Sequence, residues 1–302
     1  MINRFSIIIP TRNRAGSLKR LLTSFDSIEW PDSADSELLI VDNGSNDQTR
    51  SVLSAEHAKF RKCSLRVLEE AQKGKSSALN RGLAAAKGDI ILILDDDVVT
   101  HRELLVKHLE CYGVSHFDAI QGRVLPGLDL DDRPADPKRL REYNTPIINY
   151  GEEICEIRGL TGTNMSFNRA VFEKVGFFDP RLGPGASGFS EDTEFSMRIR
   201  KAGFKIGYTP RAVVYHELNP ARYGRAYNRD VEYRKGVSRS IYRHDSILFR
   251  VFPDLVTNCL RYGIYRILRL SQKAYKTEGR IMKCWGYLSG KLQQVTQEDS
   301  AL

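Results

Sequence analysis

The sequence predicts an α/β fold, namely a doubly wound, mostly parallel sheet followed by a helical extension. Residues 7–9, 38–41 and 90–94 are unbroken runs of branched apolar side chains. Such runs are typical of strands that are buried on both faces, as in parallel sheets. Segments with apolar residues at helical spacing separate these runs. Strand alternating with helix in this way predicts a parallel sheet with helices on both faces.

The first two predicted strands both end in polar residues. The first strand ends at Pro10, which cannot continue a hydrogen-bonded ladder, and Thr11–Arg14 follow. A helix is predicted next, because apolar residues recur at three- and four-residue steps: Leu18, Leu21, Leu22 and Phe25. The second strand, at 38–41, runs directly into the polar segment Asp42–Asp47.

The third and fourth strands are predicted at 65–68 and 90–94, with a helix at 77–86 between them that ends at Gly88. Parallel strands have their carboxyl ends at one edge of a sheet, and open α/β sheets bind ligands there. We therefore expect the polar residues after the first, second and fourth strands to meet at that edge.

Three consecutive aspartates close the fourth strand: Asp95, Asp96 and Asp97. Adjacent like charges repel each other, so this cluster costs stability unless a cation neutralises it. Carboxylate oxygens are ligands that suit Mg²⁺ or Mn²⁺, which commonly also bind substrate phosphates. A solvated acidic turn after a core strand is the alternative interpretation of the same residues.

The chain resembles the inverting family 2 of nucleotide-diphospho-sugar glycosyltransferases, which have the GT-A fold. The resemblance covers about residues 4–220 and depends on the order and spacing of several motifs. The amino-terminal motifs are IIIPTRNR at 7–14, VDNGSND at 41–47, the segment from Lys73-Gly74 to Asn80-Arg81-Gly82, and LDDD at 94–97. The later motifs are GTNMSF at 162–167, GFFD at 176–179, EDTEF at 191–195 and YHE at 215–217.

This resemblance implies a divalent metal, Mn²⁺ or Mg²⁺, that neutralises the departing diphosphate. It assigns Asp97 as a direct ligand, and Asp95 to the metal or the nearby ribose. His216, which follows a strand-like run at 212–215, would complete the metal site. A structural histidine in the core is the alternative for His216.

The resemblance also implies roles in donor binding and catalysis. The residues that would bind the donor nucleotide are Pro10, Thr11, Arg14, Asp42, Lys73, Asp95 and Asp96. A carboxylate that accepts a ring N–H from the base favours a UDP-sugar, although guanine also has such an N–H. The residues that would border the sugar are Gly162, Thr163 and Asn164. Asp192 would be the general base, with Glu191 beside it, at the start of a helix that Gly203 ends; capping of that helix is the alternative role.

Length and composition predict a catalytic domain at 1–245 and a basic, amphipathic helical extension at 246–302. The five cysteines are scattered and odd in number, so no disulfides are expected, which fits a reducing cytoplasm. The amino terminus enters a strand directly, without the features of a signal peptide. We therefore expect a cytoplasmic location. The acidic, proline-broken segment 127–150 is predicted to be a surface insertion.

The positive charge is concentrated in the carboxy-terminal third. The chain has a net charge of +8, but from Arg198 onward 21 Lys and Arg stand against 8 Asp and Glu. Apolar and arginine-rich faces alternate along 246–270, which is the pattern of an interfacial helix. This pattern predicts a peripheral contact with an anionic membrane surface, or packing on the catalytic domain. Nucleic acid is not expected as a partner, because no recognised binding module accompanies the charge.

The predicted function is therefore metal-dependent transfer of a sugar from a nucleoside-diphosphate donor to a saccharide or lipid-linked acceptor. Two other classes remain as alternatives. A sugar-1-phosphate nucleotidyltransferase would share the sheet and the acidic site, but it needs a glycine-rich phosphate loop after the first strand, where no glycine occurs before Gly16. A non-catalytic basic protein bound to membrane or RNA would explain the basic tail but not the acidic motifs.

Overall fold

The computed structural model describes residues 4–31, 36–129 and 147–299. These residues form two compact units. The first contains residues 4–31, 36–129, 147–180 and 191–219, and the second contains residues 181–190 and 220–299. The first unit is an α/β sheet structure and the second is helical. The predicted fold class, a mostly parallel sheet followed by helices, is therefore confirmed.

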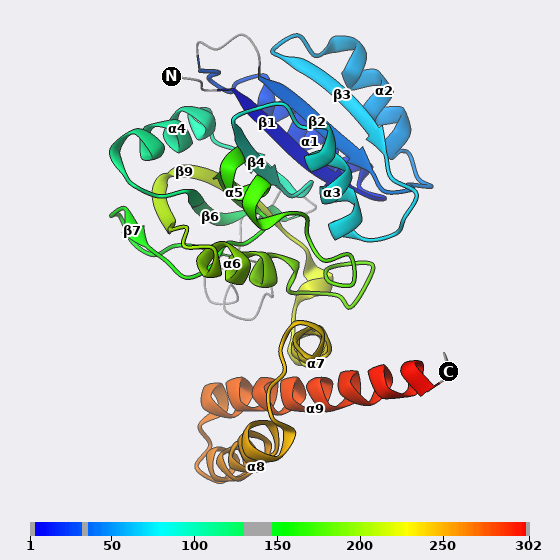
Figure 1. Ribbon diagram of the computed structural model, residues 1–302, viewed down its shortest axis with the longest axis vertical. Helices are drawn as coiled ribbons and strands as arrows, with labels where there is room; N and C mark the ends of the chain where they lie inside the picture. The colour runs from blue at the N-terminus through cyan, green and yellow to red at the C-terminus, as the bar shows by residue number, and fades with distance from the viewer. Residues whose placement is uncertain (1–3, 32–35, 130–146, 300–302) are drawn as a thin grey trace. The chain divides into compact units, whose positions relative to one another are not determined.

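The first four strands form the parallel half of the sheet, in the spatial order β3-β2-β1-β4. Their bounds are β1 Phe5–Thr11, β2 Glu37–Asp42, β3 Ser64–Glu69 and β4 Ile90–Leu94. All three pairings are parallel, and Thr11 pairs with Asp42 at the carboxyl ends of β1 and β2. Figure 1 shows these strands side by side, and because they are parallel their carboxyl ends lie at one edge of the sheet.

The second half of the sheet is mixed. It continues from β4 in the order β8-β6-β9-β5, with β7 also paired to β9. The bounds are β5 Val98–Thr100, β6 Ala119–Asp129, β7 Cys155–Glu156, β8 Asn164–Asn168 and β9 Ile206–Leu218. β8 is antiparallel to β4, and β5 is antiparallel to β9, with Val98 opposite His216. This register brings the end of β9 beside Asp97.

Helices cover both faces of the sheet. Ile7 and Ile9 of β1 belong to one apolar cluster, which contains residues of α1 (Ala15–Phe25), α2 (Thr49–Lys59) and α4 (Leu104–Val114). Ile8 belongs to the other cluster, with α3 (Lys75–Ala85), α5 (Arg169–Val175) and α6 (Glu191–Lys201). Successive residues of a strand face opposite sides, so an unbroken apolar run satisfies both layers.

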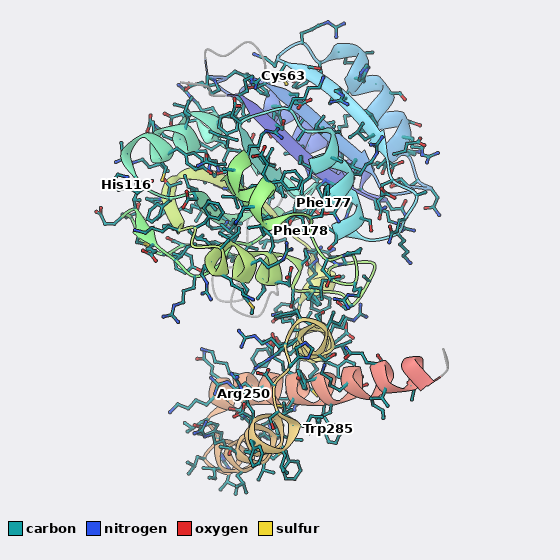
Figure 2. The ribbon with its side chains drawn as sticks, viewed as in Figure 1. Cys63, His116, Phe177, Phe178, Arg250 and Trp285 are labelled. Atoms are coloured by element: carbon teal, nitrogen blue, oxygen red, sulfur yellow. The ribbon has the colours of Figure 1, made fainter. Side chains whose placement is uncertain are left out.

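The GFFD motif helps to hold α6 on the sheet. Phe178 is buried, and its ring stacks on that of Phe195 with 4.2 Å between the ring centroids. Its chain neighbour Phe177 is exposed and makes an edge contact with Phe172 (Figure 2). Only one of the two aromatic residues therefore contributes to the core.

Most of the predicted insertion at 127–150 lies outside the described residues. At its edges, β6 continues to Asp129, and Ile148 forms an antiparallel bridge with Val124. The prediction of a surface insertion between these points stays a prediction.

The second unit is built from three helices after a short 3₁₀ turn at Pro220–Arg222. These are α7 (Arg225–Tyr242), α8 (Phe252–Ile267) and α9 (Ser271–Asp299), with a π-helical turn η3 (Ile247–Val251) leading into α8. The helix predicted within 246–270 is present. The long helix α9 packs against both α7 and α8 (Figure 1). The predicted domain boundary at residue 245 falls directly after α7 and stays a prediction.

Glycines allow α7 and α9 to approach closely. A Cβ atom on Gly286 of α9 would lie 1.9 Å from the backbone oxygen of Tyr233 on α7. A Cβ atom on Gly236 of α7 would lie 2.1 Å from the backbone oxygen of Lys283 on α9. Because both obstacles are backbone atoms, no side-chain rotation relieves the clash. Small residues at these positions therefore set the distance between the two helices.

We expect Gly286→Ala to destabilise the helical unit by about 1–3 kcal/mol, because the new methyl group forces α7 and α9 apart. The measurement is denaturant unfolding followed by far-UV circular dichroism. Gly263→Ala in α8 is the matched control, since nothing lies within 4 Å of a Cβ atom there. Alanine favours a helix over glycine by about 1 kcal/mol, so the control should be neutral or stabilising. Equal effects of the two substitutions would contradict close packing at Gly286.

Candidate active site

The candidate site lies in the first unit, where several elements end at one edge of the sheet. The acidic triplet follows β4, His216 and Glu217 lie next to the end of β9, and α6 begins with Glu191 and Asp192. The β3–α3 loop brings Lys75 into the same cluster, where its ammonium is paired with Asp95. The structure therefore groups residues that are more than a hundred positions apart in the chain.

Asp95, Asp97 and His216 form a cluster that could hold a metal ion. One ligand atom from each residue lies within 4.8 Å of the other two. Nε2 of His216 lies 3.3 Å from Oδ1 of Asp97, and both side chains are almost fully buried. Two carboxylates and an imidazole make a mixed oxygen and nitrogen donor set, which suits Mn²⁺ at least as well as Mg²⁺. The residues present thus fit a divalent cation.

The orientation of His216 supports this interpretation. Nδ1 of the ring lies 2.7 Å from the backbone oxygen of Glu217, and a carbonyl oxygen can only accept a hydrogen bond. Nδ1 therefore donates to this oxygen, and Nε2 is the ring nitrogen that faces Asp97. Fixing the tautomer through the other ring nitrogen is the usual arrangement for a metal-binding histidine.

The end of β9 is fixed from two directions. The backbone nitrogen of Glu217 donates to the backbone oxygen of Asp97 at 2.9 Å. The side chain of Glu217 accepts hydrogen bonds from Ser17, at 2.8 Å, and from Arg20, both on α1. These contacts hold His216 next to the triplet independently of any bound ion.

The ammonium of Lys75 connects the two acidic parts of the site. Its Nζ atom lies 2.5 Å from Oδ1 of Asp95 and 3.6 Å from Oε1 of Glu191. Burial lowers the pKa of Lys75, but the charges of Asp95 and Glu191 outweigh burial, so the pKa is raised. Burial raises the pKa of Asp95, but the charge of Lys75 outweighs it, and the pKa falls to about 2. Lys75 and Asp95 are therefore both charged at neutral pH.

Lys75 was not among the residues expected from the sequence, which pointed to Lys73 instead. Lys73 is exposed at the loop surface. The loop is shaped by Asn43, whose amide donates to the backbone oxygens of Glu70 and Gln72 and whose oxygen accepts from Gly74 N at 2.8 Å. Gly74 has a φ of 137°, which L side chains rarely adopt. In the sequence, Asn43 and Gly74 are the residues that could have indicated Lys75, because together they fix where α3 begins.

Asp192 lies in the first turn of α6, next to the sugar-motif residues. Its Oδ2 atom accepts from the backbone nitrogen of Gly162 at 3.4 Å, and its Oδ1 atom accepts from the nitrogen of Thr193 at 2.6 Å. Burial raises the pKa of Asp192, against the charge of Lys75 and these hydrogen bonds. Burial also raises the pKa of Glu191, to about 7.

Thr163 and Gly162 lie between the triplet and α6. The hydroxyl of Thr163 donates to Oδ2 of Asp95 at 2.9 Å. A Cβ atom on Gly162 would lie 3.0 Å from Nζ of Lys75, so the absence of a side chain leaves room for the ammonium. The structure thus places the first two residues of the predicted sugar-binding motif at the acidic cluster.

The third residue of that motif, Asn164, is enclosed in the core. Its Oδ1 atom lies 2.9 Å from Nε2 of His108, and its amide donates to the backbone oxygens of Arg123 and Ala212. Burial lowers the pKa of His108 to about 4, so the ring is neutral and Nε2 is the donor. Asn164 thus ties together α4, β6 and β9, and its contact with a sugar stays a prediction.

Asp96 contacts the end of β1. Its Oδ2 atom accepts from the hydroxyl of Thr11 at 2.8 Å. Burial raises the pKa of Asp96 to about 7, and the neighbouring charge of Asp97 adds to this rise. Arg14 lies nearby, with its guanidinium 3.9 Å from Oδ2 of Asp97. The triplet is therefore connected to two of the predicted nucleotide-binding residues.

The remaining predicted nucleotide-binding residues lie at the ends of β1 and β2. Pro10 and Asp42 are buried. The carboxylate of Asp42 already accepts from Ser45 N at 3.0 Å and from Nε of Arg50 at 3.0 Å. An N–H of the nucleobase would have to share these oxygens. The assignment of Asp42 to nucleobase binding stays a prediction.

The site thus combines a donor set for a divalent cation with a separate carboxylate of raised pKa and a cation between them. Such a combination can stabilise negative charge on one group and remove a proton from another.

Comparisons with known proteins identify the family and the fold. The family model described as Glycosyl transferase family 2 matches residues 6–176. The probable glycosyltransferase YdaM of Bacillus subtilis is 26% identical over 235 residues, which cover 71% of this chain and 50% of that protein. The O-antigen chain rhamnosyltransferase WbaN of Salmonella anatum is 27% identical over 229 residues, which cover 71% of this chain and 66% of that protein. The chain thus spans between half and two thirds of the length of these relatives.

A solved structure shares the fold. The mannosyltransferase PcManGT from Pyrobaculum calidifontis, in complex with GDP-Man and Mn²⁺, superposes with a TM-score of 0.63 at 19% identity. The superposition covers 96% of this chain and 87% of that one. At this identity the likeness shows a common GT-A type fold.

Proposed function

The chain belongs to glycosyl transferase family 2 and is an enzyme of glycosyl transfer, and from this premise we propose that it is a metal-dependent, inverting transferase. Its donor is a nucleoside-diphosphate sugar, with UDP-sugars favoured, and its acceptor is a saccharide or a lipid-linked saccharide. The observation that carries the proposal is the pairing of Lys75 with Asp95 on one side and Glu191 on the other. This pairing joins a carboxylate of the proposed metal site to the first turn of α6, which also carries Asp192.

Asp192 acts as the general base in this proposal. It accepts the proton of the acceptor hydroxyl while the hydroxyl oxygen forms its bond to the anomeric carbon. The bond to the diphosphate oxygen breaks on the opposite face, so the configuration at that carbon inverts. A raised pKa suits the role, because a base works best when its pKa approaches the working pH. The backbone N–H of Gly162 keeps the carboxylate oriented.

Asp95, Asp97 and His216 are the residues that would hold Mn²⁺ or Mg²⁺. The ion would supply positive charge that stabilises the diphosphate leaving group. Arg14, which faces Asp97, adds a further positive charge of the protein's own. The Mn²⁺ in the complex of the solved mannosyltransferase supports this cofactor assignment.

The nucleotide would lie at the ends of β1 and β2, against Thr11 and Asp42. A carboxylate acceptor there favours uracil, and guanine offers a similar ring N–H. The name of one relative refers to an O-antigen chain, which supports a saccharide chain as the acceptor class. A screen of UDP-, dTDP- and GDP-sugars for release of the nucleoside diphosphate identifies the donor.

We expect Asp192→Asn to lower kcat by about 10²–10⁴-fold, which is the usual contribution of general-base assistance. Asparagine keeps the shape and can still accept from Gly162 N–H, so the affinity for the nucleotide should change little. The measurement is steady-state kinetics with the donor found in the screen. Glu194→Gln in the same turn of α6 is the control, since Glu194 pairs only with Arg198 in the described structure and is assigned no catalytic role.

The pH profile gives a second check on Asp192. A base must be deprotonated to act, and burial raises the pKa of this carboxyl. The acid limb of the kcat profile should therefore lie above the pH at which an ordinary aspartate titrates, and it should disappear in Asp192→Asn. If this variant lost both its nucleotide binding and its stability, Asp192 would instead be identified as a helix cap.

We expect Asp97→Asn to weaken Mn²⁺ binding by tenfold or more, because a neutral amide is a much poorer ligand than a carboxylate. Titration calorimetry measures the affinity, and circular dichroism checks the fold. Asp26→Asn, at an exposed aspartate after α1, makes the same chemical change away from the site. Full activity of Asp97→Asn in the presence of chelator would overturn the metal assignment.

The helical unit is proposed to contact an anionic membrane surface. Apolar residues of η3 and α8 recur every three or four positions and are exposed, among them Phe249 at 83%, Leu260 at 65% and Ile267 at 82%. This spacing places them on one face of the helix. Trp285 of α9 is also exposed, and arginines such as Arg250 lie in the same unit (Figure 2). No helix among the described residues has the length and apolar character needed to cross a membrane.

An apolar helix face next to basic residues binds bilayers that carry negative charge. We expect the protein to sediment with vesicles containing phosphatidylglycerol and to be released by high salt, since salt screens the electrostatic part. Phe249→Asp with Leu260→Asp should abolish sedimentation. Val114→Asp, at an exposed valine of the sheet unit, is the control and should not. Equal sedimentation of all variants would contradict a contact through α8.

A further inference from the structure

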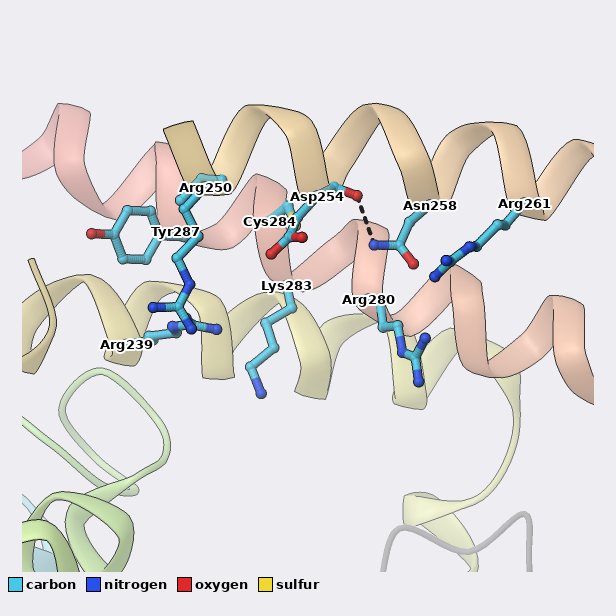
Figure 3. Close-up of a pocket in the computed structure, with 10 residues that line it drawn as sticks. Arg239, Arg250, Asp254, Asn258, Arg261, Arg280, Lys283, Cys284 and Tyr287 are labelled. Atoms are coloured by element: carbon cyan, nitrogen blue, oxygen red, sulfur yellow. Dashed lines mark hydrogen bonds between the residues drawn. The ribbon is translucent and has the colours of Figure 1, made fainter. Parts of the chain in front are cut away.

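A cavity in the helical unit has a strongly positive lining. It measures about 240 Å³ and lies among α7, α8 and α9. Figure 3 shows its basic side chains coming from all three helices and from η3. Five of the lining residues are cationic: Arg239, Arg250, Arg261, Arg280 and Lys283. The lining contains a single carboxylate, that of Asp254.

Two of these cations already form ion pairs with a carboxylate. Arg239 and Arg250 both pair with Asp245, at 2.6 Å and 2.8 Å. Arg261, Arg280 and Lys283 have no carboxylate partner within ion-pair distance in the part of the chain that the structure describes. Burial lowers the pKa of Lys283, and the charges of Lys235 and Arg239 lower it further, against Glu232. The cavity therefore has an excess of positive charge in the absence of a ligand anion.

Asn258 supplies an independent indication of a ligand. It lines the cavity and is only 8% exposed. Its amide nitrogen donates to the backbone oxygen of Asp254 at 2.7 Å, which fixes the orientation of the side chain (Figure 3). Its Oδ1 atom is buried and accepts no hydrogen bond from any described residue. A buried acceptor without a donor is costly, so this oxygen is a candidate acceptor for a hydroxyl or an N–H of a ligand.

We propose that this cavity binds the phosphate of a small polyol phosphate. The guanidinium groups of Arg261 and Arg280 and the ammonium of Lys283 bind the phosphate oxygens, since guanidinium forks match phosphate geometry. A hydroxyl of the polyol donates to Oδ1 of Asn258. The cavity lies wholly within the helical unit, so this site is separate from the cluster around Lys75 and does not depend on the function proposed for it.

Two sources carry this chemistry, namely a soluble polyol phosphate and the glycerophosphate headgroup of a lipid. Titration calorimetry with sn-glycerol 3-phosphate tests the first source. Sedimentation with vesicles of phosphatidylglycerol and phosphatidylcholine tests the second. The informative variant is the double substitution Arg261→Gln and Arg280→Gln. Its control is Arg266→Gln with Lys276→Gln, which removes one exposed cation from α8 and one from α9 outside the cavity.

We expect sn-glycerol 3-phosphate to bind saturably to the full-length protein, and the cavity variant to lose about tenfold or more in affinity, because it lacks both guanidinium contacts to the phosphate. The control variant should bind as the wild type does. Asn258→Leu should remove the preference for sn-glycerol 3-phosphate over methyl phosphate, which has no hydroxyl donor. If only the vesicles distinguish the cavity variant from its control, the ligand is the lipid headgroup. If neither assay distinguishes the two variants, the proposal is wrong.

Discussion

The buried ammonium of Lys75 is the constraint on which the candidate site depends. A buried charge is tolerated only when it is paired, because removing an ion from water is costly. Lys75 meets this requirement with carboxylates from two different elements, Asp95 after β4 and Glu191 at the start of α6. Each of those carboxylates also needs the ammonium. The end of a central strand and the start of a distant helix are therefore held together by one charge.

The surrounding residues hold the ammonium of Lys75 and its carboxylate partners in position. Asn43 and Gly74 shape the loop from which α3 begins, so that Lys75 enters the site in the first turn. Gly162 leaves room for the ammonium, because any side chain there would contact Nζ. On the other side of the triplet, Glu217 fixes the end of β9 through Ser17 and the backbone of Asp97. The site is thus largely formed before any ligand arrives.

The sequence was sufficient to predict the sheet and the acidic edge. Unbroken apolar runs identify strands that are covered on both faces, and the polar residues after them identify the edge where ligands bind. The meeting of Asp95, Asp97 and His216 agrees with the expected metal site, although binding itself stays a prediction. Lys75 could not be found in this way, because its importance comes from a loop geometry that Asn43 creates. Asn164 shows the opposite case, since a motif residue expected near the sugar is tied into the core by His108.

The helical unit shows a second limit of sequence patterns. The periodicity of 246–270 predicts an amphipathic helix, and α8 has an exposed apolar face. The cavity depends on how α7, α8 and α9 pack, and glycines that carry no charge pattern set the distance between α7 and α9. Clustered arginines in a sequence can therefore indicate a solvated face, a membrane contact or a specific anion site. Only the positions of their partners distinguish these possibilities.

The pH profile of Lys75→Met, compared with Lys75→Arg, tests the central role of this ammonium most directly. The charge of Lys75 lowers the pKa of both Glu191 and Asp192, so its removal must raise them. The acid limb of the kcat profile should therefore move to higher pH in Lys75→Met and stay close to that of the wild type in Lys75→Arg. An unchanged acid limb in a correctly folded Lys75→Met variant would contradict the account.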